Sequence, residues 1–165
     1  MATLARRRAR QIKTLVGFTI ADVHYAIDIH RVREIIRPLE LIPLPHMPPA
    51  VLGVCDHRGA VVPVVDVRTR FGLPMSTASR QRWIVADFGT RLVALVVDAV
   101  TDVFGRSDVE ERTVPQIGVG DTARGITSVE SHGGVLVFVI DIERIAAVAE
   151  VLDLSSIYPM GGDKS

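Results

Sequence analysis

The side chains of this chain that could do metal or acid–base chemistry are five histidines and one cysteine: His24, His30, His46, His57, His132 and Cys55. No two histidines stand four residues apart, as two ligands on one helix face would, and Cys55 has no partner at the spacing of metal ligands. We therefore interpret the histidines as surface or loop imidazoles. We predict no metal site and no cofactor.

Two further patterns could indicate catalysis or phosphate binding, and both lack the context they need. Ser107, Ser128 and Ser131 lie near charged residues but not in a nucleophile-elbow sequence. Residues 118–125 contain three glycines, but without the lysine and the strand–loop–helix context of a phosphate-binding loop. We therefore predict that the protein is not an enzyme.

Composition limits the class of protein and of partner. The chain has 165 residues, 48% of them hydrophobic, and a formal net charge of zero. It can bury a core, as one large domain or two small lobes. A balanced charge does not favour nucleic acid or direct membrane insertion. The single cysteine excludes an intramolecular disulfide, and no run approaches the roughly 20 apolar residues of a membrane span. We expect a cytoplasmic protein.

The two ends of the chain are predicted to be flexible. Residues 6–10 contain four arginines, and we interpret residues 1–13 as a solvated basic tail. A loose contact with phosphate or with an acidic partner is the alternative for these arginines. Residues 153–165 end in two glycines and three polar residues and are predicted to form a second flexible tail.

Two segments of the sequence resemble later segments. Residues 53–68 have a fainter copy in residues 132–144 at an offset of 75, which pairs His57 with His132 and Asp66 with Asp141. Residues 25–35 match residues 93–103 at an offset of 68. Because both echoes run in the same order, the chain is predicted to use one β-rich unit twice. The equivalence of the two histidines favours a shared backbone role in each unit.

Short apolar runs between glycine, proline and aspartate predict mainly β structure. Expected strands cover residues 14–20, 24–27, 52–55, 60–65, 82–88, 91–97, 100–104, 126–130 and 135–140. Residues 29–37 have helical spacing, with Asp28 as N-cap, and the proline-rich residues 41–49 predict an extended connector. Residues 67–71 predict one helical turn, residues 106–124 a long mobile connection and residues 142–152 a C-terminal helix.

The fold class is therefore mainly all-β, with about ten strands in two groups of five. Small barrels are favoured because closure removes exposed sheet edges. We place the boundary between the two subdomains in residues 72–79. Subdomain 1 is expected to cover about residues 14–74 plus the helix 142–152, and subdomain 2 about residues 80–141.

One ion pair is predicted. Glu34 lies in the expected helix and Arg58 at a turn next to Gly59. The guanidinium could reach back to the carboxylate and fix the turn against the helix. Two independent solvated side chains are the alternative.

The ordered set of motifs resembles the CheW family of chemotaxis coupling proteins, from about residue 14 to residue 149. The matching motifs are Phe18-Thr-Ile, Tyr25-Ala-Ile-Asp-Ile, Val32-Arg-Glu-Ile, Ile42-Pro-Leu-Pro, Gly53-Val, Arg58-Gly, Val62-Pro-Val-Val-Asp-Val-Arg, Val96-Val-Asp-Ala-Val and Val139-Ile-Asp-Ile. The resemblance implies two five-stranded β-barrel subdomains. It also implies an adaptor that couples chemoreceptors to a CheA-type histidine kinase, or a CheW-like scaffold in a non-chemotactic chemosensory pathway.

The resemblance also implies two contact surfaces. Contacts with the signalling tip of the receptors would involve Val32, Glu34, Ile35, Gly53, Arg58, Val97 and Val100. Contacts with the regulatory domain of the kinase would involve Pro38, Leu39, Ile42, Leu44, Asp66, Arg68 and Arg70. The sequence departs from the family pattern at Asp56-His57, where the family usually has Asn-Leu.

Overall fold

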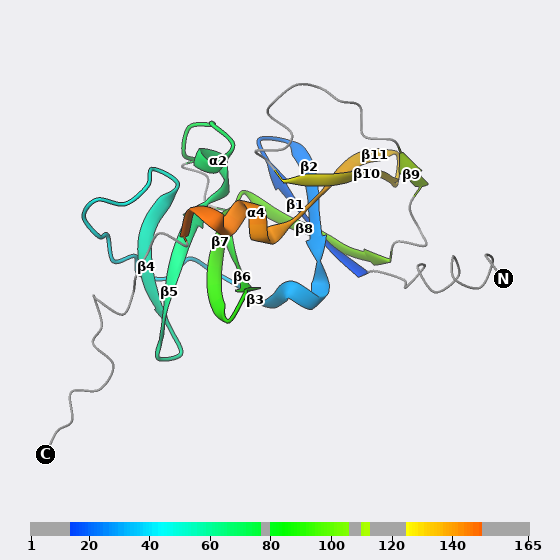
Figure 1. Ribbon diagram of the computed structural model, residues 1–165. Helices are drawn as coiled ribbons and strands as arrows, with labels where there is room; N and C mark the ends of the chain where they lie inside the picture. The colour runs from blue at the N-terminus through cyan, green and yellow to red at the C-terminus, as the bar shows by residue number, and fades with distance from the viewer. Residues whose placement is uncertain (1–13, 77–79, 106–109, 113–124, 150–165) are drawn as a thin grey trace, which may run out of the picture.

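The computed structural model describes residues 14–76, 80–105, 110–112 and 125–149, which form mainly β-strands with short helical turns. The predicted fold class is confirmed. Figure 1 shows two curved sheets side by side, with the short helix α4 (Ile142–Ala146) between them. No described helix has the length and apolarity that a membrane span requires.

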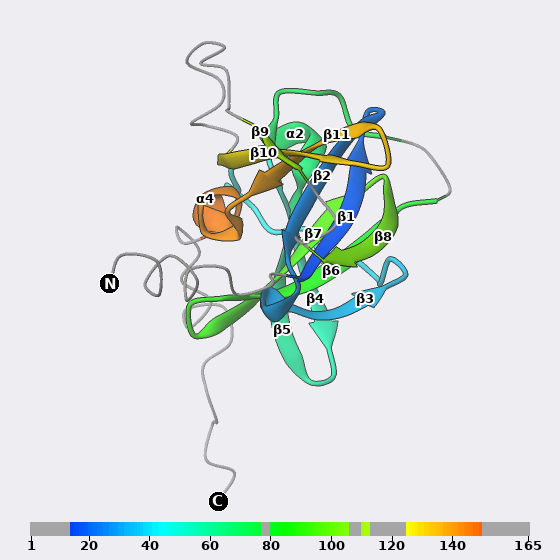
Figure 2. The same ribbon diagram turned by 90° about the vertical axis from the view of Figure 1, so that its right-hand side faces the viewer.

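The first sheet has six strands. Their order is β8–β1–β2–β11–β10–β9, and β2 pairs with β11 in parallel. The bounds are β1 Thr14–Ile20, β2 Val23–Asp28, β8 Ala99–Gly105, β9 Glu110–Arg112, β10 Ile126–His132 and β11 Val135–Ile140. Figure 2 shows the molecule from the side on which this sheet lies in Figure 1. Strand β9 lies in the segment predicted to be a mobile connection, so that prediction was wrong for these three residues. Residues 106–109 and 113–124 lie outside the described ranges.

The second sheet has five strands in the order β3–β6–β7–β5–β4. The bounds are β3 Val32–Ile36, β4 Val51–His57, β5 Ala60–Asp66, β6 Arg82–Phe88 and β7 Arg91–Val97. Residues 37–50 connect β3 to β4, which are the two edges of the sheet. This connector is held against β4 by mutual backbone hydrogen bonds between Ile42 and Val54, at 2.8 and 2.9 Å. Because the connector covers the edge of β4, fewer backbone groups are left open for pairing with another chain.

The strand pairings reproduce both sequence echoes residue by residue. Leu15 pairs with Phe104 on β8, and at an offset of 68 Trp83 pairs with Ile36 on β3. The hairpins β4–β5 and β10–β11 have the same register at an offset of 75, including a bulge at the same place. Val64 pairs with Ala94 and its equivalent Val139 pairs with Ala26. The chain therefore contains a structural repeat, β1–β5 with the short helix α2 (Val67–Arg70) and β6–β11 with α4.

The repeats exchange strands, and this corrects the expected subdomain boundaries. The first sheet takes β1 and β2 from the first repeat and β8–β11 from the second, whereas the second sheet takes β3–β5 from the first and β6–β7 from the second. The boundary expected at residues 72–79 does separate the two repeats. However, β5 before it and β6 after it both belong to the second sheet, so it does not separate the two sheets. Sequence similarity shows which segments are equivalent. It does not show which sheet each strand joins, because that depends on long-range backbone pairing.

The helix predicted over residues 29–37 was wrong in most of its length. Asp28 is the N-cap, but it caps a single 3-10 turn, η1 (Ile29–Arg31), by accepting from the backbone N–H of His30. The chain then continues as β3, whose side chains alternate between half-buried and exposed. Pairing with β6 satisfies the backbone groups of β3, and β-branched residues such as Val32 and Ile35 favour a strand. Helical spacing over nine residues was too short to decide between the two periods.

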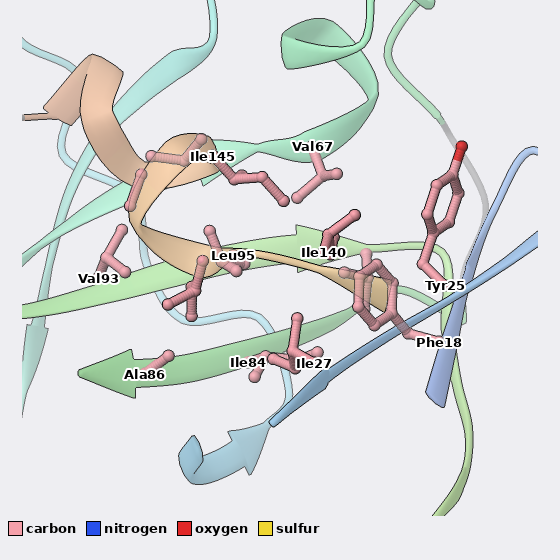
Figure 3. Packing of buried hydrophobic residues seen from close by; sticks show 14 of the residues in the cluster. Phe18, Tyr25, Ile27, Val67, Ile84, Ala86, Val93, Leu95, Ile140 and Ile145 are labelled. Atoms are coloured by element: carbon pink, nitrogen blue, oxygen red, sulfur yellow. The ribbon is translucent and has the colours of Figure 1, made fainter. Parts of the chain in front are cut away.

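Apolar side chains form one large central cluster and one smaller cluster within each sheet. Figure 3 shows the central cluster, where Phe18 and Tyr25 of the first sheet lie near Ile84 and Leu95 of the second. Ile145 of α4 is fully buried in this cluster, in agreement with the predicted C-terminal helix. A 3-10 turn, η3 (Ala147–Ala149), follows α4, and residues 150–152 of the expected helix lie outside the described ranges. The central cluster therefore packs the two sheets into one unit.

Asp98 joins three parts of the fold. Its carboxylate accepts hydrogen bonds from Arg68 Nε and Nη2 of α2, both at 2.7 Å, and from the backbone N–H of Ala21 in the β1–β2 turn at 2.8 Å. Partial burial acts to raise the pKa of Asp98, but the hydrogen bonds from Arg68 and Ala21 and the charge of Arg68 hold the pKa below its ordinary value of 3.8. Asp98 therefore stabilises the fold in its charged form.

We expect Asp98→Asn to lower the free energy of unfolding at pH 7 by about 1–3 kcal/mol, because hydrogen bonds to a charged group are lost. A carboxylate with a lowered pKa stabilises the fold above its unfolded-state pKa, and this contribution is lost as the pH falls through the folded-state pKa. The difference between wild type and variant should therefore be constant near neutral pH and shrink below about pH 4. Urea unfolding at several pH values measures it, and equal stabilities at pH 7 would contradict the expectation.

Cys55 is a buried free thiol inside the second sheet. Burial, and to a smaller extent the charge of Asp56, raise the pKa of the Cys55 thiol. Because the thiolate is the reactive form, we expect a chromogenic thiol reagent to label the native protein much more slowly than the protein in concentrated denaturant. Equal labelling rates at pH 7.5 would contradict this expectation.

Candidate partner-binding surface

Glu34 on β3 is in contact with both His57 and Arg58 at the end of β4. Arg58 Nη2 donates to Glu34 Oε1 at 2.9 Å, and His57 Nε2 lies 3.2 Å from Glu34 Oε2. The pair predicted between Glu34 and Arg58 is therefore present, although Glu34 is carried by a strand instead of the expected helix. Since β3 and β4 are the two edges of the second sheet, these contacts draw the edges together.

The local backbone presents Arg58 outward from a tight turn. Arg58 has a φ of 52° and Gly59 a φ of 82°, and Asp56 Oδ1 accepts from the backbone N–H of Gly59 at 2.9 Å. The side chain of Arg58 is 75% exposed and that of Glu34 33% exposed. An ion pair this open to water contributes about 0–1 kcal/mol to stability. The pair is thus better suited to presenting charge to a partner than to holding the fold.

The other sheet contains an equivalent contact. His132 Nε2 lies 3.4 Å from Asp102 Oδ2, and these residues are related to His57 and Glu34 by the two sequence offsets. His132 also stacks on Phe104, with ring centroids 4.1 Å apart. The expectation that the two histidines have a shared backbone role missed this carboxylate–imidazole contact, which joins β10 to β8. The two sequence offsets together would have indicated it. The offset of 68 relates Glu34 to Asp102, and the offset of 75 relates His57 to His132.

The other predicted receptor contacts differ in their access to solvent. Ile35 is 39% exposed beside Glu34, whereas Val32 and Val100 are half-buried against the central cluster. Val97 and Gly53 are buried in this chain, and their contact with a partner stays a prediction. Val97 belongs to the central cluster, and Gly53 faces the backbone of the 37–50 connector.

The predicted kinase contacts fall into two groups. Pro38, Leu39 and Ile42 are exposed on the 37–50 connector, and Leu44 is half-buried there. Asp66 is only 2% exposed, because it caps α2 through the backbone N–H and hydroxyl of Thr69. The carboxylate of Asp66 is thus used within the fold, and its contact with the kinase stays a prediction.

The remaining two residues of that set are arginines of α2. Arg68 is engaged by Asp98, and Arg70 Nη2 donates to the backbone carbonyl of Arg144 at 3.3 Å. The exposed apolar residues of the connector are thus the more accessible part of the predicted kinase surface.

Among the described residues, no group of three or more potential ligands is placed to hold a metal ion. The arrangement around Glu34 supplies an exposed arginine, a carboxylate, a shielded imidazole and a neighbouring isoleucine. Such a combination of apolar and charged side chains is suited to reversible binding of another protein.

Comparisons with known proteins agree on one family. A family model described as CheW-like domain matches residues 14–160. A Rhizobium meliloti protein named chemotaxis protein CheW is 35% identical over 136 residues, covering 80% of this chain and 88% of that protein. A protein of the same name from Klebsiella aerogenes is 30% identical over 135 residues, with 81% of each chain covered. The crystal structure of the scaffolding protein TtCheW from Thermoanaerobacter tengcongensis matches with a TM-score of 0.72 at 25% identity, covering 82% of this chain and 92% of that chain.

Proposed function

The chain belongs to the CheW-like domain family, and from that premise we propose that it is a non-catalytic adaptor that couples chemoreceptors to a CheA-type histidine kinase. The observation that carries the proposal is the match to chemotaxis proteins over most of the chain, together with a solved relative described as a scaffolding protein. The adaptor acts in the cytoplasm, where it associates with receptor arrays through its partners.

The receptor-binding surface, in this proposal, consists of Glu34, Ile35 and Arg58 with the half-buried Val32 and Val100. Val32 and Val100 are equivalent positions of the two repeats and lie on β3 and β8, the strands that the repeats exchange. A partner that contacts both valines therefore binds at the junction between the two sheets. The charged group around Glu34 supplies orientation, and the apolar residues supply buried area.

The kinase-binding surface is proposed to lie on the connector between β3 and β4. Leu39 is 39% and Ile42 40% exposed. The connector contains five prolines, which restrict its backbone before any partner binds, so little freedom is lost on association. Pro38, Leu39, Ile42 and Leu44 form this surface, and Arg70 lies nearer to α4.

The adaptor works by linked binding. It holds the receptor on one surface and the kinase on another, which raises their effective concentration toward each other. A signal passes only if the contacts differ in strength between the signalling states of the receptor. No covalent step by this chain is needed.

Co-purification tests the proposal directly. A tagged full-length protein expressed in its native cell should capture chemoreceptors and a large histidine kinase, identified by mass spectrometry. The identity of the receptors also separates chemotaxis from a non-chemotactic chemosensory pathway, since the adaptor role is common to both. Capture of neither receptors nor kinase, with the protein folded and abundant, would contradict the proposal.

A further inference from the structure

The two partners of the Glu34 carboxylate differ in their exposure to water. The side chain of His57 is 12% exposed, whereas that of Arg58 is 75% exposed. An exposed arginine fixes a carboxylate only weakly, because water competes for both groups. The imidazole is packed between the sheet edges and has less freedom. His57 therefore has the larger part in determining where the Glu34 carboxylate lies.

The charged surroundings of His57, within the described residues, come from β3 and from its own hairpin. β3 contributes Glu34, the β4–β5 hairpin contributes Asp56 and Arg58, and β5 places the uncharged Ala60 opposite His57. The carboxylate of Asp56 is held by the backbone N–H of Gly59. Glu34 is thus the carboxylate that an imidazolium at this position contacts.

We propose that His57 is a positioning residue for the receptor-binding surface. In its protonated state the imidazole holds Glu34 so that the carboxylate and the Arg58 guanidinium have one arrangement before the receptor binds. This inference rests on the proposed function, because it assigns a pH dependence to the same surface.

The direction of the pH dependence follows from the charge of the ring. Histidine changes its charge between about pH 5 and 8, and a protonated ring binds a carboxylate more strongly than a neutral ring. Side chains that are already ordered lose less freedom on binding. Affinity for the receptor is therefore higher when the His57 ring carries its proton than when it is neutral.

The test uses the full-length protein and the soluble cytoplasmic fragment of a co-purifying chemoreceptor. We expect the wild type to bind about two- to fivefold more tightly at pH 6 than at pH 8, the size of effect given by an ion pair that keeps some contact with water. His57→Gln keeps an amide N–H near the position of Nε2 but cannot gain a proton, so the difference between its two affinities should be smaller than in wild type. Glu34→Gln, which removes the acceptor charge, should reduce the difference in the same way.

His132→Gln is the matched control. His132 contacts Asp102 in the equivalent place of the other sheet and does not belong to the proposed receptor surface. This variant should keep the pH dependence of the wild type. An unchanged pH dependence in His57→Gln would overturn the inference. So would an equal loss in His132→Gln, because the effect would then come from sheet closure in general.

Failure of the proposed function gives a different result. If the folded wild type binds no receptor fragment at any pH, the proposed function is overturned. Nuclear magnetic resonance of the free protein then tests the positioning alone. A His57 ring titration that changes in Glu34→Gln would support it, and an identical titration in both proteins would overturn it.

Discussion

Replacing Gly53 with alanine is expected to destabilise the protein by about 3 kcal/mol or more, the range of backbone strain combined with overpacking. A Cβ atom at this position would stand 2.3 Å from the carbonyl oxygen of Ile42 and 3.0 Å from the Cα of Pro43. Both are backbone atoms of the proline-rich connector, so they cannot rotate away as a side chain would. Gly53 also has a φ of 147°, which L side chains rarely adopt.

The clash lies where the connector meets the sheet. Ile42 and Val54 exchange two backbone hydrogen bonds there, and Gly53 is next to a bulge in the β4–β5 pairing. Relief of the clash requires the connector to move, and those hydrogen bonds would then lengthen or break. We therefore expect a lower unfolding temperature and also weaker kinase binding, since the connector carries the proposed kinase surface.

Gly89→Ala is the control for backbone strain alone. Gly89 has a φ of 58° in the β6–β7 turn, and a Cβ there would meet no atom within 4 Å. This variant should lose only about 1 kcal/mol. Thermal and urea unfolding of both variants compare the two positions. Equal losses of stability in the two variants would mean that the close approach of the connector to Gly53 does not contribute to the destabilisation.

The fold could be predicted from the sequence in its local elements and in its repeat, but not in its strand exchange. The strands 14–20, 82–88, 91–97 and 135–140 agree with the structure to the residue, because apolar alternation and turn residues are local signals. The helix predicted over residues 29–37 was wrong because nine residues fit both periods, and pairing with β6 decided between a helix and a strand. The exchange of β3 and β8 depends on contacts between residues more than 40 positions apart, which no local pattern encodes.

The candidate site, like the fold, could be predicted from the sequence only in part. The pair of Glu34 and Arg58 was accessible from the sequence, because a charge in an apolar segment and an arginine at a glycine turn each need a partner. His57 was interpreted as a loop imidazole, since its contact with Glu34 exists only when the two sheet edges meet. Val97, Gly53 and Asp66 lie in segments that match the family, but a sequence match does not show which side chains are buried.

Reversing either charge of the Glu34–Arg58 pair is expected to weaken receptor binding by about tenfold or more, because like charges then face each other at the surface that orients the partner. Stability should change little, since the pair is exposed and contributes about 0–1 kcal/mol. The variants are Glu34→Arg and Arg58→Glu, and affinity for the receptor fragment at pH 7 is the measurement. Binding within twofold of wild type for both would remove this pair from the proposed surface.

The double variant Glu34→Arg with Arg58→Glu separates a contact role from a structural one. It restores opposite charges at the two positions, but it places a cation beside His57, which contacts a carboxylate in the native protein. We therefore expect its stability to stay close to that of wild type, as in the single variants, while its receptor binding stays weak. Recovery of binding would mean that the partner needs only an intact pair and does not read which residue carries which charge.

Arg33→Glu is the matched control for these reversals. Arg33 is the neighbour of Glu34 on β3, but its own partner lies elsewhere: Arg33 Nε donates to Asp87 Oδ1 at 2.8 Å. Its side chain is 65% exposed, close to the 75% of Arg58, and the variant makes the same change of charge. Receptor affinity should change less than about twofold, since exposed charges away from the contact act only through a screened field. Equal weakening by Arg33→Glu and Arg58→Glu would show that net charge, and not the Glu34–Arg58 geometry, governs receptor binding.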